Sequence, residues 1–285
     1  MASTEGMTTL GVVSFLNARP LIEGLDASSG ISLHYAVPAA LPAMLREGVV
    51  DAALIPVIDL ARGADRWQRI SNACIGSDGE TLTVRVFSKT PPERMTMLYV
   101  DPDSHTSVAL AQLIWSYLFE RRLAFRPLVG LASSQSDRHD AGLTLEDCES
   151  VLLIGDKVVT APLEGFEYEV DLGGAWKAWQ GLPFVFAVWA VKRGAAFQLM
   201  PHGHDARATH HGQDAHAMLA DKLESARDRG VVNARRIAEQ AGPAHGWPPD
   251  LATDYLLRRL SYTLTPRHLK GMQRFLELCV EERII

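Results

Sequence analysis

The polar residues best suited to bind a small anion lie in a short turn near the start of the chain. Ser14, Asn17 and Arg19 follow the apolar run 10–13, and Pro20 after them suits the first turn of a helix. A turn between a strand and a helix presents free backbone N–H groups at the positive end of the helix. The Asn17 amide can donate to a carboxylate or accept from a hydroxyl. The Arg19 guanidinium can bind a carboxylate through two hydrogen bonds. The residues also allow a second interpretation, in which Asn17 only caps the helix and Arg19 forms a structural ion pair.

A second polar turn, at residues 101–107, comes before the clearest helical pattern of the chain, 104–119. Ser104, Thr106 and Ser107 crowd the start of that helix. Hydroxyls and unpaired N–H groups in a first helical turn can bind an anion. The alternative is a capped helix start that binds no ligand.

Asp156 follows the compact apolar run 151–154 and Gly155, so it is expected at the carboxyl end of a strand. A carboxylate at that position could orient a hydroxyl, or act as a base if desolvation raised its pKa. It could equally cap the helix that follows.

The elements that would position these residues alternate along the chain. Strands are expected at 10–13, 32–37, 52–55, 81–88, 97–100, 151–154 and 184–191, and helices at 41–47, 104–119, 215–229, 234–241, 251–259 and 266–281. Strands that alternate with helices predict an α/β protein with mostly parallel sheets. The breaker 89–92 suggests a crossover into a second lobe, and the long apolar run 184–191 a return to the first.

This order predicts a two-lobed, periplasmic-binding-protein-like fold. Residues 1–90 and 190–285 are expected to form the first lobe, and residues 91–189 the second. In such folds a ligand binds in the cleft between the lobes, at the carboxyl ends of strands and at helix N-termini.

Composition excludes several classes of protein. The chain has 285 residues and a net charge of −6, without a dense run of Lys and Arg, which argues against nucleic-acid binding. No apolar run approaches the roughly 20 residues of a membrane span. The N-terminal residues lack the basic and apolar regions of a signal peptide. Cys74, Cys148 and Cys279 form no disulfide framework, so a cytoplasmic location is expected.

No cofactor or metal is expected. The chain contains no Walker-type loop, no GxGxxG and no GxSxG sequence, so nucleotide-cofactor and serine-hydrolase chemistry lack support. A histidine-rich stretch runs over residues 202–216, but its spacing matches no familiar zinc pattern. We interpret it as a polar surface connection.

Five segments, in order, resemble the chorismate dehydratase family of the futalosine route to menaquinone. They are residues 14–21, 51–56, 101–107, 153–156 and 179–189. The resemblance implies the type II periplasmic-binding-protein fold and a lyase that dehydrates chorismate to 3-[(1-carboxyvinyl)oxy]benzoate. Chorismate carries two carboxylates, and the two polar turns could bind one each.

The resemblance also implies roles for single residues. Asn17 is expected to contact the substrate, together with Thr83, which stands where the family has serine. The proton acceptor remains open between a substrate carboxylate and Asp156. The chain also departs from the family pattern at Gly174, where an acid is usual, and at Gln180, where threonine is usual.

Rival functions on the same fold remain possible at this stage. One is a solute-binding protein that holds a small carboxylate and catalyses nothing. Another is the related enzyme that makes 1,4-dihydroxy-6-naphthoate, and a third is a ligand-sensing regulatory domain. The sequence does not indicate an oligomeric state.

Overall fold

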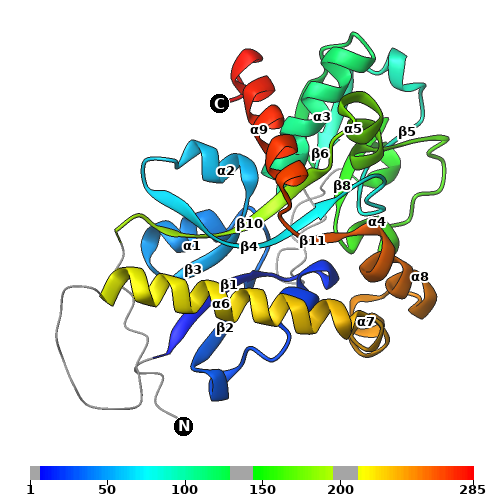
Figure 1. Ribbon diagram of the computed structural model, residues 1–285. Helices are drawn as coiled ribbons and strands as arrows, with labels where there is room; N and C mark the ends of the chain where they lie inside the picture. The colour runs from blue at the N-terminus through cyan, green and yellow to red at the C-terminus, as the bar shows by residue number, and fades with distance from the viewer. Residues whose placement is uncertain (1–6, 129–143, 195–210) are drawn as a thin grey trace.

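The computed structural model describes residues 7–128, 144–194 and 211–285, which form two α/β lobes (Figure 1). Within this part of the chain each lobe is built on one sheet. The first sheet has the strand order β11-β4-β10-β3-β1-β2, with β1 Thr8–Val13, β2 Ile31–Ala36, β3 Ala52–Pro56, β4 Trp67–Ser77, β10 Phe184–Lys192 and β11 Ser261–Thr263. The second has the order β7-β6-β8-β5-β9, with β5 Val84–Ser88, β6 Met97–Val100, β7 Ala124–Pro127, β8 Ser150–Ile154 and β9 Tyr168–Asp171.

Parallel pairing brings polar turns to one edge of each sheet. In the first sheet β1 pairs in parallel with both β2 and β3, and in the second β6 pairs in parallel with β7 and β8. The carboxyl ends of these strands lead into the turns at residues 14–19 and 101–107, so both turns lie where ligands bind in α/β folds.

The chain returns to the first sheet through β10, as its apolar sequence predicted. The strand pairs antiparallel with β3 on one side and β4 on the other. Its residues Phe184, Val185 and Val188 to Val191 are buried, because the strand is central and covered on both faces.

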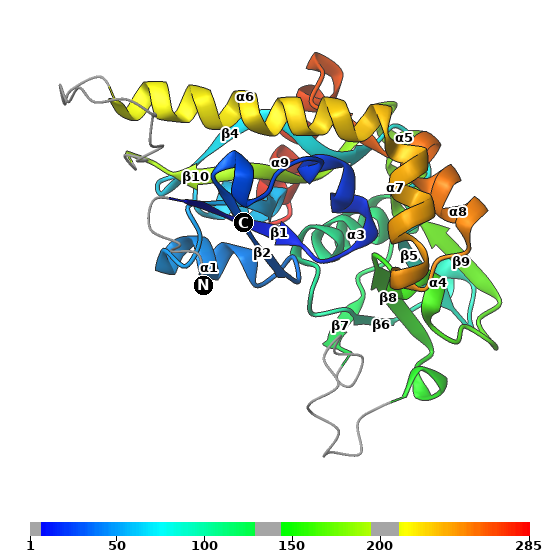
Figure 2. The ribbon, with the colours of Figure 1, turned by 90° about the horizontal axis from the view of Figure 1, so that it is seen from below.

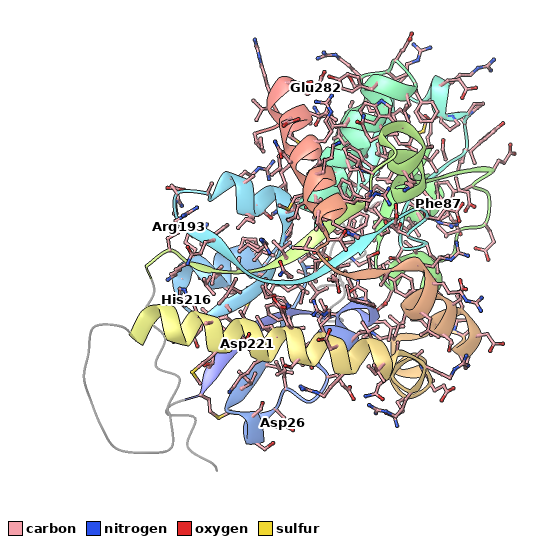
Figure 3. The ribbon with its side chains drawn as sticks, viewed as in Figure 1. Asp26, Phe87, Arg193, His216, Asp221 and Glu282 are labelled. Carbon is pink, nitrogen blue, oxygen red and sulfur yellow. The ribbon has the colours of Figure 1, made fainter. Side chains whose placement is uncertain are left out.

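The first crossover lies earlier than expected. β5 pairs antiparallel with β8 and β9, so it belongs to the second sheet rather than to the first lobe. The breaker at residues 89–92 ends β5 but does not separate the lobes, because the chain has already crossed between β4 and β5. We propose that the lobes divide at residues 78–83 and 181–183 instead of 90 and 190. In Figure 3 Phe87 of β5 accordingly lies among the elements of the second lobe, whereas Asp221 lies on a helix beside the first sheet.

Helices cover both sheets and bridge the lobes. Their bounds are α1 Leu41–Glu47, α2 Val57–Arg62, α3 His105–Leu118, α4 Lys157–Thr160, α5 Leu172–Gln180, α6 His211–Val232, α7 Ala234–Ala241, α8 Pro249–Asp254 and α9 Pro266–Glu281. A π-helix, Tyr255–Arg259, continues α8. Figure 2 shows α6 and α1 on opposite sides of the first sheet. Residues of α7 and α8 pack with Val159 of the second lobe, so the C-terminal helices tie the lobes together.

The helix expected after β1 is a 3-10 helix, Leu16–Ile22, with Pro20 inside it. Proline has no N–H with which to close an α-helical turn there. This segment packs directly on α6, where a Cβ at Gly230 would lie 1.8 Å from the Pro20 carbonyl oxygen. Gly230 therefore permits the close approach that holds the first polar turn in place.

Among residues 7–128, 144–194 and 211–285, no helix is long and apolar enough to cross a bilayer. In the same residues, no three His, Cys, Asp or Glu side chains gather as a metal site would require. Residues 202–210 of the histidine-rich stretch lie outside the described part of the chain.

Candidate active site

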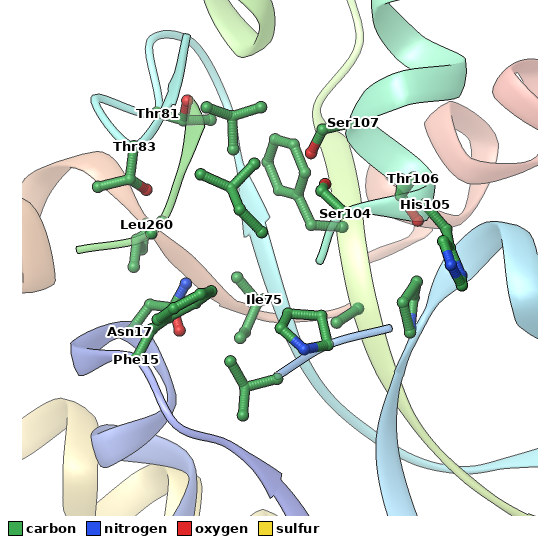
Figure 4. Close-up of a pocket in the computed structure, with 18 of the residues that line it drawn as sticks. Phe15, Asn17, Ile75, Thr81, Thr83, Ser104, His105, Thr106, Ser107 and Leu260 are labelled. Atoms are coloured by element: carbon green, nitrogen blue, oxygen red, sulfur yellow. The ribbon is translucent and has the colours of Figure 1, made fainter. Parts of the chain in front are cut away.

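A pocket of about 60 Å³ lies between the lobes, where the two polar turns meet (Figure 4). Its walls come from the carboxyl end of β1, the start of α3, the crossover before β5, the end of β8 and the C-terminal segment. The lining residues are Val13, Phe15, Asn17, Pro38, Pro56, Ile75, Thr81, Thr83, Val84, Ser104, His105, Thr106, Ser107, Ile154, Gly155, Phe186, Ala187, Tyr255 and Leu260.

Polar groups stand at two sides of this pocket, with apolar walls between them. Figure 4 shows Asn17 and Thr83 on one side, and Ser104 and Ser107 at the start of α3 on the other. The space between them is bounded by side chains such as Ile75, Phe186 and Leu260. An apolar pocket with a few convergent polar groups is the usual form of a small-molecule site.

The first polar side combines Asn17, Thr83 and Tyr255. The Thr83 Oγ1 and Tyr255 hydroxyl oxygens are 2.6 Å apart, and both side chains are buried. Burial raises the pKa of Tyr255, so its hydroxyl stays neutral and can donate as well as accept. Asn17 Oδ1 is buried and accepts no hydrogen bond from the described residues. A buried oxygen of this kind is expected to receive a donor from a ligand.

The second polar side is the N-terminus of α3. Ser104 is the N-cap residue, yet its side chain makes no capping hydrogen bond. The first α3 backbone N–H to bond within the helix is that of Val108, which donates to the Ser104 carbonyl. Ser104 and Ser107 are both at most 5% exposed, and Thr106 Oγ1 accepts a bond from the Ile58 N–H at 3.4 Å. The arrangement suits a bound anion.

An ion pair holds the turn before α3. Lys157 donates to both carboxylate oxygens of Asp101 at 2.9 Å and to Asp103 at 2.6 Å. Burial raises the pKa of Asp101, while Lys157 opposes that rise. The ion pairs of Lys157 hold the turn that positions Ser104 and Ser107 at the pocket.

Three of the expected site residues, Ser14, Arg19 and Asp156, do not line the pocket. Ser14 follows β1, and its N–H donates to the Ala36 carbonyl. Arg19 lies over the Tyr35 ring, 5.1 Å from its centroid. Gly174 and Gln180 belong to α5 and also lie outside the pocket lining. Of these three departures from the family pattern, Thr83 is the one that lines the pocket.

Asp156 joins the lobes instead of facing the pocket. Its carboxylate accepts the Leu16 N–H at 3.2 Å, His245 Nδ1 at 2.7 Å and Trp247 Nε1 at 2.8 Å. We call these four groups the Asp156 junction. All three donors belong to segments of the first lobe or next to it, so these hydrogen bonds link the lobes.

Sequence reasoning missed several pocket residues. Tyr255 comes from a π-helix, an element that is frequent at functional sites but has no simple sequence pattern. Phe15 packs so closely on Gly155 that a Cβ there would lie 2.4 Å from its ring. Gly155 also has a φ of +60°, so glycine is required there on both grounds. His105 stands in the second polar turn and pairs with Asp59, which is 46 residues away in the sequence.

Hydrogen bonds join the lobes beside this pocket, from the Leu16 N–H to Asp156 and from the Ile58 N–H to Thr106. The space of about 60 Å³ is small beside the roughly 300–1,000 Å³ of typical ligand pockets. We expect the lobes to separate as a molecule with a six-membered ring enters. Closure then excludes water from the bound molecule, a condition that strengthens polar interactions inside the pocket.

Comparisons with known proteins agree with the fold. A chorismate dehydratase of Thermus thermophilus is 27% identical over 94% of this chain and 93% of its own length. A solved protein of Archaeoglobus fulgidus superposes with a TM-score of 0.69 at 13% identity, covering 99% of both chains. The periplasmic aliphatic sulphonate binding protein of Escherichia coli has a TM-score of 0.57 at 15% identity, covering 98% of this chain and 88% of that one. The superposition on the Escherichia coli protein confirms the predicted periplasmic-binding-protein-like fold.

A sequence model described as menaquinone biosynthesis matches residues 8–281, which include both lobes and all the segments that line the pocket. The chain belongs to the menaquinone biosynthesis family.

Proposed function

We propose that this protein is a lyase that dehydrates chorismate to 3-[(1-carboxyvinyl)oxy]benzoate. One observation carries the proposal: the closed pocket has polar groups on two sides and apolar walls between them. Chorismate has the matching form, with a carboxylate on its ring and another on its enolpyruvyl arm. The similarity to the Thermus enzyme over nearly the whole chain supports the same substrate.

In the proposed complex, one carboxylate binds at the start of α3. The hydroxyls of Ser104 and Ser107 and the unpaired N–H groups of the first turn donate to it. The C4 hydroxyl lies beside Asn17 and Thr83. Asn17 Oδ1 accepts its hydrogen and so orients it, while the Thr83 hydroxyl donates to its oxygen as the C4–O bond breaks. Tyr255 fixes the Thr83 hydroxyl through their short hydrogen bond.

The reaction removes the C3 hydrogen as a proton and breaks the C4–O bond. The two electrons of the C3–H bond form the new ring double bond. The proton passes through its acceptor to the departing hydroxyl, which leaves as water. Among the described residues that line the pocket, none is an aspartate or a glutamate. We therefore assign the role of proton acceptor to a carboxylate of the substrate itself. The enzyme contributes orientation, hydrogen bonds to the leaving hydroxyl and exclusion of water.

The test is incubation of the purified protein with chorismate, in the presence of a chelator, followed by liquid chromatography and mass spectrometry. An aromatic product lighter than chorismate by one water is expected. It should be absent without protein and with heat-denatured protein. Chorismate recovered unchanged, with binding still visible by calorimetry, would replace the proposal with a non-catalytic binding protein.

The buried hydrogen bond between Thr83 and Tyr255 yields a first prediction. Tyr255→Phe keeps the ring that stacks on Trp247 at 4.7 Å but removes the hydroxyl. Loss of one buried hydrogen bond to a substrate-binding group is expected to lower kcat/KM by roughly 5- to 30-fold. Tyr262→Phe is the matched control, since it removes a buried tyrosine hydroxyl that does not line the pocket. A kcat/KM for Tyr255→Phe equal to that of the unsubstituted protein would remove Tyr255 from the site.

We also propose a cytoplasmic location. The cysteines Cys74, Cys148 and Cys279 are all free and buried, as is usual in a reducing compartment.

A further inference from the structure

The pocket lacks the cations that usually bind a ligand with two carboxylates. Among its described lining residues, none is a lysine or an arginine. His105 is the lining residue there that can carry a full positive charge. It is the first residue of α3 and lies on the same side of the pocket as Thr106 (Figure 4).

Asp59 fixes the orientation of the His105 ring. Nδ1 of His105 lies 2.7 Å from Oδ2 of Asp59, which is only 6% exposed. A carboxylate accepts hydrogen bonds, so Nδ1 carries the hydrogen and donates it. The Nε2 atom is thereby left for another partner. A carboxylate on one ring nitrogen is the arrangement that commonly orients a functional histidine.

This pair crosses the boundary between the lobes. Asp59 belongs to α2 beside the first sheet, whereas His105 begins α3 in the second lobe. The Ile58 N–H donates to Thr106 Oγ1 across the same boundary. Ile58 is next to Asp59 in the sequence, and Thr106 is next to His105. His105 also borders an outer cavity of about 440 Å³ that Arg62, Asp101 and Arg283 line. Its ring therefore stands between the inner pocket and the more open outer cavity.

From these contacts we infer that the His105 side chain binds one carboxylate of the substrate, in an orientation that Asp59 fixes. The inference rests on the proposed function and adds to it a binding residue. It explains how a pocket without lysine or arginine can hold a dianion. It also means that substrate and closure act together, since the pair assembles across the lobe boundary.

The experiment compares His105→Gln with the unsubstituted protein, using the exposed His34→Gln on β2 as the matched control. Loss of a charge-assisted hydrogen bond is expected to raise the KM for chorismate by about 10- to 100-fold. The kcat is expected to change by less than about threefold, because His105 holds the substrate and takes no part in proton transfer. Calorimetry with 3-[(1-carboxyvinyl)oxy]benzoate, which keeps both carboxylates and does not react, should show the same loss of affinity.

Asp59→Asn provides a second readout. The amide oxygen can still accept from Nδ1, but the amide can also turn its NH2 group toward the ring, so it fixes His105 less well. Asp59 Oδ1 also accepts from Arg62 at 3.5 Å, and the amide oxygen can keep that bond. The KM for chorismate should rise in Asp59→Asn, by less than in His105→Gln.

The outcomes separate the inference from the proposed function. Unsubstituted protein that does not convert chorismate contradicts the function, and the calorimetric comparison then still tests His105. A KM and product affinity of His105→Gln within about twofold of the unsubstituted values would overturn the inference. So would a loss of kcat at unchanged KM, because it would place His105 in the chemistry. If His105→Gln fails to fold by circular dichroism, the KM of Asp59→Asn decides.

Discussion

Asn17→Ala is expected to lower kcat by about 100-fold, the usual loss when the group that orients a reacting atom is removed. Asn17 Oδ1 is buried in the pocket without a donor from the described residues, so it is available to the substrate hydroxyl. Alanine removes both the acceptor and the amide donor. The measurement is the rate of product formation at saturating chorismate, followed by mass spectrometry.

Ser14→Ala is the control for this prediction, because Ser14 lies in the same turn but does not line the pocket. It should keep kcat within about twofold of the unsubstituted protein. If Asn17→Ala retained full kcat, Asn17 would have no role in the chemistry. If both variants lost activity equally, the turn as a whole would matter rather than the amide.

Asp156→Ala is expected to lower the free energy of unfolding by about 3 kcal/mol or more. The change leaves the Leu16 N–H, His245 Nδ1 and Trp247 Nε1 without their common acceptor. Each unsatisfied, partly buried donor contributes about 1–3 kcal/mol of destabilisation. Urea denaturation followed by tryptophan fluorescence measures the loss, and Asp221→Ala on the surface of α6 is the control.

Asp156→Asn distinguishes the structural role from a catalytic one. Asparagine keeps one acceptor oxygen, so stability and turnover should both fall, and by less than in Asp156→Ala. Abolished turnover with unchanged stability and unchanged product affinity would instead show that Asp156 is the proton acceptor. The distances within the Asp156 junction argue for the first result, because three donors already occupy this carboxylate.

Much of the fold was predictable because it rests on local patterns. The alternation of apolar strands with helices predicted two lobes, and the apolar run 184–191 predicted the return strand β10. The sheet to which β5 belongs was not predictable, since a short run of valines and phenylalanine fits either sheet equally well. Its partners β8 and β9 lie more than 60 residues further along the chain.

The site was predictable where it depends on turns. Asn17, Ser104 and Ser107 line the pocket because each follows a strand whose carboxyl end faces the cleft. Asp156 occupies the same kind of position, yet it lies outside the lining because His245 and Trp247 bind it. These partners come from the C-terminal segment, 89 and 91 residues from Asp156. No periodicity in the sequence predicts such a contact.

The Asp156 junction makes one backbone amide a reporter of lobe opening. The Leu16 N–H donates to a side chain of the other lobe, whereas the neighbouring Ala18 N–H donates to Phe15 within the same turn. Separation of the lobes should therefore free the Leu16 amide hydrogen for exchange with solvent while the turn stays folded. Its exchange rate would measure the open population directly, and a ligand that holds the lobes together would slow it.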